Sequence, residues 1–246
     1  MVEDPRVVLI TGGTRGIGLA TAIRFAQLGY RVAVTYVRHR QSADAAVSQL
    51  QQVGDVMLFK ADVRRPEAMK EVAEAIAHQW GRVDVAIHNA ASGVAKPLSE
   101  VTQHHFEFTM GTNAWGLVSL AQAVAPMMPA GGSIVGIGSL GSVRAYQNYG
   151  LVGASKAALE ALARHLARDY GPAGIRVNVV SAGPIDTDAL HAFSNREDML
   201  NEFVARNPLR QALDASDVAE AVVFVAQQRM VNGQVLVVDG GYLAMA

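Results

Sequence analysis

VVLITGGTRGIG, residues 7–18, joins a short apolar run to a turn that contains four glycines. The run Val7–Ile10 is typical of a buried strand, and a helical pattern begins at Ile17. Glycines at such a turn let the backbone approach a pyrophosphate, whose charge is stabilised by the amino end of the helix. The alternative is that these glycines serve only the backbone conformation of the turn. We predict a dinucleotide site formed by Gly12, Thr14, Arg15, Gly16, Ile17 and Gly18.

Strand and helix patterns alternate along the rest of the chain. Short β-branched runs predict strands at Val7–Ile10, Arg31–Tyr36, Val56–Lys60, Val83–His88, Ser133–Gly138, Arg176–Val180 and Gln234–Val238. Helical patterns fill the gaps at Ile17–Leu28, Gln41–Gln52, Pro66–Gln79, Thr102–Val124, Tyr149–Tyr170 and Ala215–Gln227. Most of the strands are apolar without alternation, which indicates a parallel sheet covered on both faces. We predict an α/β fold: a single-domain, Rossmann-like, doubly wound parallel sheet of about seven strands with helices on both faces, spanning residues 1–246.

The composition excludes several classes of protein. Hydrophobic residues make up 50% of the 246 positions and charged residues 17%, so much of the chain must lie in a large core. The net charge of -1 gives no reason to expect nucleic acid or an anionic membrane as partner. Cysteine is absent, which excludes disulfides and thiol chemistry. Since no signal peptide and no apolar run of about 20 residues is present, we expect a cytoplasmic protein.

The end of the second predicted strand bears on the choice of dinucleotide. Sites that prefer NAD usually place a carboxylate there for the ribose hydroxyls. This strand is followed by Arg38, His39 and Arg40, and the next acid is Asp44. Arg15, in the glycine turn, lies where it could reach the same ribose. Because guanidinium groups match phosphate in geometry and charge, Arg15, Arg38 and Arg40 predict NADPH as cofactor. The alternative is a solvated arginine cluster at the start of a helix.

Further candidate contacts lie where the third and fourth predicted strands end. Asp62 and Val63 end the third strand, and Asp62 either contacts adenine or caps the helix that begins near Pro66. Small residues at the end of the fourth strand either leave room for a cofactor or permit tight packing. They are Asn89, Ala90 and Ala91.

Tyr149 and Lys156 are the candidate catalytic pair. Seven helical residues at about 100° each bring the two side chains to one face of a helix, about 10.5 Å apart along its axis. A nearby cation favours the phenolate, so we expect Lys156 to lower the pKa of Tyr149 and to make it a proton donor or an oxyanion-binding group. The alternative is a tyrosine on the rim of an amphipathic helix and a solvated lysine.

Asn113 and Ser139 are candidate supporting groups. Asn113 lies within the Thr102–Val124 helix, where asparagine is a poor helix former. A buried amide there could hold a water or a backbone carbonyl beside the active site, and a satisfied core asparagine is the alternative. Ser139 follows the fifth strand, at the carboxyl edge of the sheet where ligands bind. No metal site is predicted, because no His-Glu-x-x-His or similar ligand spacing occurs.

Several of these features together resemble the short-chain dehydrogenase/reductase superfamily, over essentially the whole chain. They are the glycine turn, Asn89-Ala90, Asn113, Ser139 and Lys156. Common members of that superfamily place their catalytic tyrosine four residues before the lysine, where this chain has Val152. Tyr149 stands seven residues before Lys156, a spacing similar to that of the enoyl-[acyl-carrier-protein] reductases.

The closer resemblance is to the NADPH-dependent type called enoyl-[acyl-carrier-protein] reductase III. The NADH type carries a second tyrosine directly after the serine, where this chain has Leu140. The segments that carry the resemblance are residues 89–93, 139–142, 155–161, 185–190 and 195–198. The resemblance implies that Tyr149 and Lys156 are catalytic and that the protein is a homotetramer built on its two long helices. It also implies that Ile185 and Thr187 meet the nicotinamide carboxamide or the pyrophosphate.

Residues 188–210 mix apolar and charged side chains after the sixth strand. We predict that this segment is a lid that orders over the substrate, with its apolar side lining a pocket for the acyl chain. The alternative is an ordinary amphipathic helix on the surface.

The position of Tyr149 also has a physical rationale. Hydride adds to the oxygen-bearing carbon of a ketone, whereas in an enoyl thioester it adds to C3 while charge develops on the oxygen at C1. A shift of three residues moves the backbone position of the tyrosine by roughly 4.5 Å along the helix axis. This distance is comparable with the two-carbon separation between C3 and C1 of the substrate. We therefore predict an NADPH-dependent enoyl-[acyl-carrier-protein] reductase of fatty-acid synthesis, acting on an enoyl thioester held by acyl-carrier protein. The alternatives are a carbonyl (3-ketoacyl thioester) reductase, a non-catalytic NADPH-binding regulator, and a related reductase of specialised metabolism.

Overall fold

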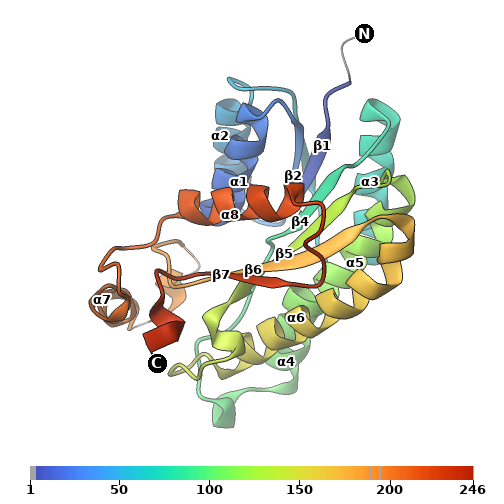
Figure 1. The fold of residues 1–246 in the computed structure, drawn as a ribbon. Coiled ribbons are helices and arrows are strands. Elements are labelled where there is room, and N and C mark those ends of the chain that lie inside the picture. Colours follow the sequence, from blue (N-terminus) through green and yellow to red (C-terminus); the bar gives the residue numbers. More distant parts are fainter. Residues whose placement is uncertain (1–3, 189, 194, 246) are drawn as a thin grey trace.

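A computed structural model describes residues 4–188, 190–193 and 195–245 of the chain (Figure 1). Among these residues, seven strands form one parallel sheet in the order β3-β2-β1-β4-β5-β6-β7. The strands are β1 (Val7–Thr11), β2 (Arg31–Tyr36), β3 (Val56–Lys60), β4 (Val85–His88), β5 (Ser133–Ser139), β6 (Arg176–Ala182) and β7 (Val235–Val238). The order reverses between β1 and β4, so the predicted doubly wound sheet is confirmed.

Helices cover both faces of the sheet (Figure 1). One face carries α1 (Gly16–Gln27), α2 (Arg40–Leu50) and α8 (Ala215–Gln227). The other carries α3 (Pro66–Trp80), α5 (Gly116–Val124) and α6 (Gly150–Tyr170). Apart from α5, whose predicted helix began at Thr102, these bounds match the predicted helices to within a few residues. Short 3-10 turns lie between the longer elements and at the end of the described chain: η1 (Leu98–Glu100), η3 (Ala125–Met127), η4 (Leu140–Ser142), η5 (Gly171–Ala173), η6 (Leu190–Ala192) and η7 (Tyr242–Met245).

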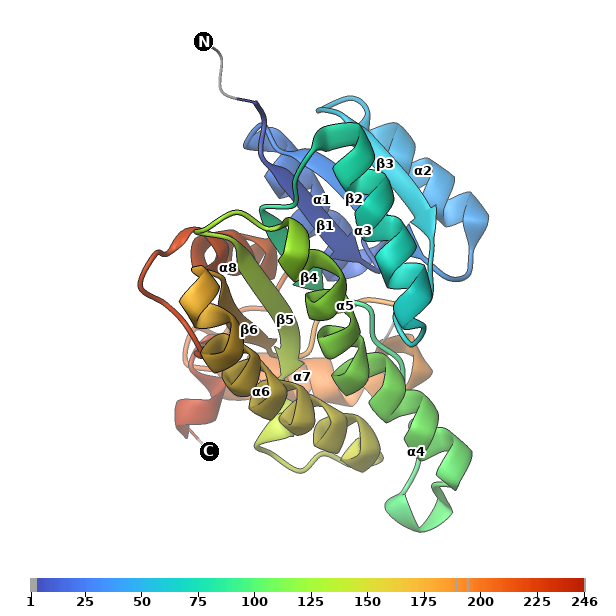
Figure 2. The same cartoon turned by 90° about the vertical axis from the view of Figure 1, so that its right-hand side faces the viewer.

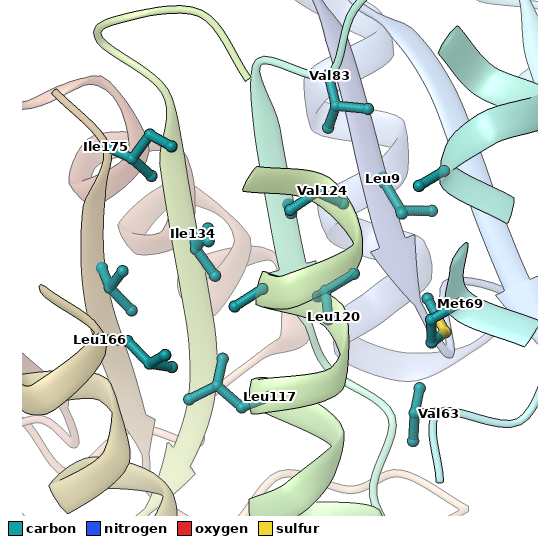
Figure 3. Close-up of a cluster of buried hydrophobic side chains, with 14 of the residues drawn as sticks. Leu9, Val63, Met69, Val83, Leu117, Leu120, Val124, Ile134, Leu166 and Ile175 are labelled. Atoms are coloured by element: carbon teal, nitrogen blue, oxygen red, sulfur yellow. The ribbon is translucent and has the colours of Figure 1, made fainter. Parts of the chain in front are cut away.

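The core consists of two apolar layers, one on each face of the sheet. Leu9 and Ile134 point towards α3, α5 and α6 and pack with Leu120 of α5 (Figure 3). Val8 and Ile10, the neighbours of Leu9, point to the opposite face and pack under α1 and α8. Successive residues of a strand face opposite sides. Since both sides are buried here, the strands read as unbroken apolar runs in the sequence.

The helix predicted over Thr102–Val124 is present but is not regular. It consists of α4 (Gln103–Met110), a π-helical turn η2 (Gly111–Trp115) and α5. Thr102 caps α4, because its side chain accepts a hydrogen bond from the backbone N–H of His105 while His105 bonds back to the Thr102 backbone. π-turns of this kind often occur at functional sites, and this one contains Asn113.

Two helices lie beyond the carboxyl end of the sheet, opposite the start of β1 (Figure 2). They are α4 and α7 (Arg196–Arg206). The predicted lid, residues 188–210, therefore contains a helix, and Phe203 on its buried side packs against the Tyr242 ring with centroids 5.4 Å apart. Ala189 and Ser194 of the predicted lid lie outside the described residues. Within the described chain, none of the helices has the length and apolar character needed to cross a membrane.

Candidate active site

The glycine turn between β1 and α1 has the geometry of an anion cradle. Gly12 and Gly16 have φ angles of +64° and +52°, which other residues adopt only with strain. A side chain at Gly18 would overlap the carbonyl oxygen of Gly12, so the helix can approach the turn only because Gly18 has none. The described residues provide neither a side-chain cap nor an acidic residue in the first turn of α1. Its amino end and positive dipole are thus available to a pyrophosphate, and the turn fits the predicted dinucleotide.

Asn89 holds this turn in place from the end of β4. Its Nδ2 atom donates to the carbonyl oxygens of Thr11 and Gly12, at 3.2 and 2.8 Å. The backbone N–H groups of Asn89 and Ala90 in turn donate to the Thr11 hydroxyl. A Cβ atom on Gly12 would lie 3.1 Å from the Ala90 Cα atom. The close approach therefore explains why residue 12 must be a glycine; Ala90 is partly buried against the core, and Ala91 is exposed.

A cleft of about 640 Å³ separates the glycine turn from the loop that follows β6. Five of the predicted cofactor-binding residues line it together: Thr14, Arg15, Gly16, Ile185 and Thr187. The Arg15 guanidinium donates to the Asp188 carboxylate at 3.0 Å, and both side chains are more than half exposed. Tyr149 and Lys156 do not line this cleft. It therefore corresponds to one end of the predicted site, and the candidate catalytic pair lies elsewhere.

The arginines after β2 differ in their contacts. Arg40 donates to both carboxylate oxygens of Asp44, at 2.8 and 3.0 Å, and to the Tyr36 hydroxyl at 3.3 Å. These bonds, first to Tyr36 and then to Asp44, raise the pKa of Arg40. Arg38 is exposed at the end of the strand. Arg40 thus bonds through its Nε and Nη1 atoms, whereas Arg15 makes one bond, from Nη1 to Asp188, so Arg15 and Arg38 are better placed than Arg40 to receive a 2′-phosphate.

The structure corrects one reading of Asp62. Its carboxylate accepts hydrogen bonds from the Arg64 guanidinium at 2.6–3.1 Å and from the Arg64 backbone N–H at 3.0 Å. The bond to Arg64 lowers the pKa of Asp62. The residue before α3 is Arg65, which provides no side-chain cap, so Asp62 does not cap that helix. Val63 is buried in the core (Figure 3), so its side chain is not available to a cofactor.

Tyr149 lies where β5 ends and α6 begins. It is the residue before the first turn of α6, and its hydroxyl is 3.0 Å from the Ser139 hydroxyl. Two glycines permit this approach, because a side chain at Gly141 would overlap the Tyr149 ring and one at Gly153 would overlap the Gly141 carbonyl. The Tyr149 ring also packs against Phe193 with centroids 5.5 Å apart. The structure therefore brings Ser139, at the carboxyl edge of the sheet, within hydrogen-bond distance of Tyr149, a contact that was not predicted.

The expected effect of Lys156 on Tyr149 is wrong. Burial raises the pKa of Tyr149, and the hydrogen bond from Ser139 opposes that rise only in part. Lys156 is 5% exposed, and its Nζ atom donates to the carbonyl oxygen of Ile137 at 2.7 Å. Burial lowers the pKa of Lys156 to about 8. Lys156 is therefore not the solvated lysine of the alternative reading, and Tyr149 remains protonated at neutral pH.

Asn113 is fully buried, and its side chain forms hydrogen bonds with other residues of the protein. Its Oδ1 atom accepts from the Ser92 backbone N–H at 2.9 Å. Its Nδ2 atom donates to the Ser92 carbonyl at 2.9 Å and to the Ser155 hydroxyl at 2.8 Å. Asn113 thus joins the segment after β4 to α6, one residue before Lys156. The satisfied core asparagine is the reading that the geometry supports, and its role is to position α6.

Sequence reasoning missed His88, a single histidine in an apolar strand. Its Nε2 atom is 3.1 Å from the Asn113 carbonyl oxygen, and its Nδ1 atom is 3.4 Å from the Thr11 hydroxyl. Burial, and then the charge of Lys156, lower the pKa of His88 to about 3, so the ring is neutral. His88 therefore connects the glycine turn to the π-turn. Thr11 and Asn113 are far apart in the sequence, so their common contact with His88 can be found only from the three-dimensional structure.

The described residues contain no cluster of three or more metal-binding side chains. They do provide a pair of hydroxyls, a buried lysine and an anion cradle along one edge of the sheet. The pair consists of the Ser139 and Tyr149 hydroxyls. Because Tyr149 is protonated, it can donate a hydrogen bond to an oxygen that gains negative charge.

Comparison with known proteins agrees with this geometry. Residues 12–243 match a family model described as enoyl-(acyl carrier protein) reductase. The chain is 35% identical to the 1-cyclohexenylcarbonyl-CoA reductase of Streptomyces collinus, over 98% of this chain and 88% of that protein. It is 34% identical to an enoyl-[acyl-carrier-protein] reductase [NADH] of Nostoc sp., over 96% of both chains. A short chain dehydrogenase from Burkholderia cenocepacia, solved in complex with NADP, superposes with a TM-score of 0.90 at 34% identity, covering 98% of this chain and 99% of that one.

Proposed function

The chain belongs to the short-chain dehydrogenase/reductase superfamily, in the family described as enoyl-(acyl carrier protein) reductase, and on that premise we propose that it reduces the C2=C3 double bond of a trans-2-enoyl thioester with NADPH. The observation that carries this proposal is the location of the Tyr149 hydroxyl. It lies 3.0 Å from the Ser139 hydroxyl at the carboxyl edge of the sheet, on a residue seven positions before Lys156. The names of two relatives, one an enoyl-[acyl-carrier-protein] reductase and one a cyclohexenylcarbonyl-CoA reductase, support an unsaturated thioester.

Position 152 distinguishes this chain from common members of the superfamily, which have their catalytic tyrosine four residues before the lysine. Val152 stands four residues before the lysine and packs against Gly93, where a side chain would overlap its methyl group. It is buried and contributes no polar group. A hydroxyl three residues earlier on the helix lies farther along the substrate by roughly 4.5 Å, which suits an oxygen two carbons away from the carbon that receives hydride.

The bound nicotinamide would supply the hydride for C3, and uptake of a proton at C2 would complete the reduction. The protein's own part is to bind and orient both reactants and to stabilise charge on the thioester oxygen. Tyr149 is protonated and donates its hydrogen bond to that oxygen, while Ser139 fixes the direction of the Tyr149 hydroxyl. Lys156 brings a buried positive charge to the nicotinamide ribose, and the glycine turn holds the pyrophosphate.

Paired substrates test the reaction class directly. With NADPH, we expect turnover of a crotonyl thioester and little turnover of an acetoacetyl thioester, measured as loss of NADPH absorbance. Each thioester is supplied both on acyl-carrier protein and on coenzyme A, because the carrier is a separate question. Turnover of the keto substrate alone would replace this proposal with a carbonyl reductase. Turnover of neither, in a protein that binds NADPH, would favour a regulator.

The preference for NADPH rests on Arg15 and Arg38. We expect Arg15→Ala to raise the KM for NADPH about tenfold to hundredfold, because a charge-assisted hydrogen bond to phosphate contributes about 1.5–3 kcal/mol. The KM for NADH should change little, since NADH has no 2′-phosphate. Arg40→Ala is the matched control, because Asp44 and Tyr36 already bind its guanidinium. Equal catalytic efficiency of the unmodified protein with NADH and NADPH would contradict the preference.

The setting of the reaction follows from the same proposal. We place it in the cytoplasm, in fatty-acid synthesis, with acyl-carrier protein presenting the substrate. A homotetramer would use the helices over 102–124 and 149–170 as its interfaces. The exposed rings of Phe106 and Trp115, on the first of these helices, support that assembly.

A further inference from the structure

Glu160 is a buried acidic residue of α6 to which the proposed reaction gives no role. Its side chain is 8% exposed, and its Oε1 atom is buried without a hydrogen-bond partner among the described residues. A carboxylate in such surroundings is costly unless an opposite charge lies nearby. Lys156 precedes Glu160 by four residues, and residues four apart are neighbours on a helix surface.

Lys156 and Glu160 face the same part of β5. The Lys156 Nζ atom donates to the Ile137 carbonyl at 2.7 Å. The Glu160 Oε1 atom lies 3.3 Å from the place that a Cβ atom would take on Gly138, the next residue of the strand. The ammonium and the carboxylate therefore lie over consecutive residues of β5, and the missing side chain of Gly138 leaves room for the carboxylate.

Few other charged or polar groups act on this pair within the described part of the chain. Arg164 lies one turn farther along α6 and is exposed, and Ser142 of η4 acts on the carboxylate. His88 of β4 is neutral, with a pKa of about 3, and contributes no charge. Burial lowers the pKa of Lys156 to about 8, and the charge of Glu160 opposes that fall. Burial likewise raises the pKa of Glu160, and Ser142, then the charge of Arg164 and then that of Lys156 oppose the rise.

We propose that Glu160 is a positioning residue for Lys156: its buried carboxylate keeps the lysine charged and directed towards the end of β5, where the lysine meets the nicotinamide ribose. This inference rests on the proposed function to the extent that Lys156 contacts the cofactor. It adds that the charge of Lys156 depends on a second residue, which does not touch the cofactor. Removal of the carboxylate would leave burial less opposed, so Lys156 would lose its proton at a lower pH.

Glu160→Gln tests this directly, because it removes the charge and preserves the shape of the side chain. NADPH binding is followed by nucleotide fluorescence from neutral to alkaline pH. We expect the alkaline loss of binding to move about 1 pH unit lower in the variant, as is typical for the loss of a nearby opposite charge. Arg168→Gln is the matched control, an exposed residue farther along the same helix, and its binding curve should coincide with that of the unmodified protein.

The outcomes are separable. A folded Glu160→Gln variant with an unmoved pH curve would overturn the proposal, even if its Tm were lower, because that result indicates a structural role alone. If Glu160→Gln does not fold, Glu160→Asp takes its place: its carboxylate lies farther from Lys156, so the curve should still move to lower pH, and an unmoved curve overturns the proposal. NADPH binding needs no enoyl substrate, so failure to reduce crotonyl thioesters would overturn the proposed function without affecting this result.

Discussion

Tyr149→Phe is expected to lower kcat for enoyl thioester reduction by about 10²–10³-fold, the usual cost of removing one donor to a developing oxyanion. The substitution removes only the hydroxyl that lies 3.0 Å from Ser139 and leaves the ring against Phe193. The Kd for NADPH should change little, because the hydroxyl acts on the substrate oxygen. Single-turnover rates with crotonyl thioester, together with NADPH titration, measure both quantities.

Tyr146→Phe is the matched control for this experiment. The Tyr146 ring lies 6.1 Å from the Tyr149 ring, and its hydroxyl is buried without a hydrogen-bond partner among the described residues. Burial raises the pKa of Tyr146 to about 12, so it is also protonated at neutral pH. We expect its loss to change kcat by only a few-fold. If the two variants lost activity equally, the Tyr149 effect would be one of packing, and the assignment of its hydroxyl would fail.

The sequence predicted the fold well because the signals for it are local. Apolar runs such as Val7–Ile10 mark buried strands, and the glycine spacing after that run requires a strand, a turn and a helix in that order. The position of Ser139 at the carboxyl edge was predicted as well, because the residue ends a strand of a parallel sheet, but its hydrogen bond with Tyr149 was not.

The electrostatics of the site were not predicted because they depend on burial and on contacts between distant residues. Asn113 and Ser155 are 42 residues apart, and their hydrogen bond forms only because the sheet order brings η2 beside α6. The alternative reading of Lys156 was a solvated lysine, and nothing in the sequence marked Glu160, four residues later on the helix, as buried. The structure buries both, which lowers the pKa of Lys156 and raises that of Glu160.

Gly18→Ala is expected to abolish NADPH binding and to destabilise the protein by about 1–3 kcal/mol, the typical cost of an extra carbon in a well-packed site. The new Cβ atom would overlap the Gly12 carbonyl oxygen and lie 2.5 Å from the Asn89 Nδ2 atom. Asn89 cannot yield without losing its hydrogen bonds to Thr11 and Gly12, so the turn itself must open. The N–H groups at the start of α1 would then no longer converge on a pyrophosphate.

Gly54→Ala separates this local effect from the general effect of replacing a glycine. Gly54 lies between α2 and β3, and the nearest atom to its Cβ position is the Tyr30 carbonyl oxygen at 3.8 Å, an ordinary contact. Its stability should stay within about 0.5 kcal/mol of the unmodified protein, with unchanged NADPH affinity. Thermal unfolding with and without NADPH measures both properties, because a bound ligand raises Tm only if the folded site accepts it. A Gly18→Ala variant that NADPH still stabilised to the same degree would show that the cofactor does not use this turn, and the mechanism would lose its anchor for the pyrophosphate.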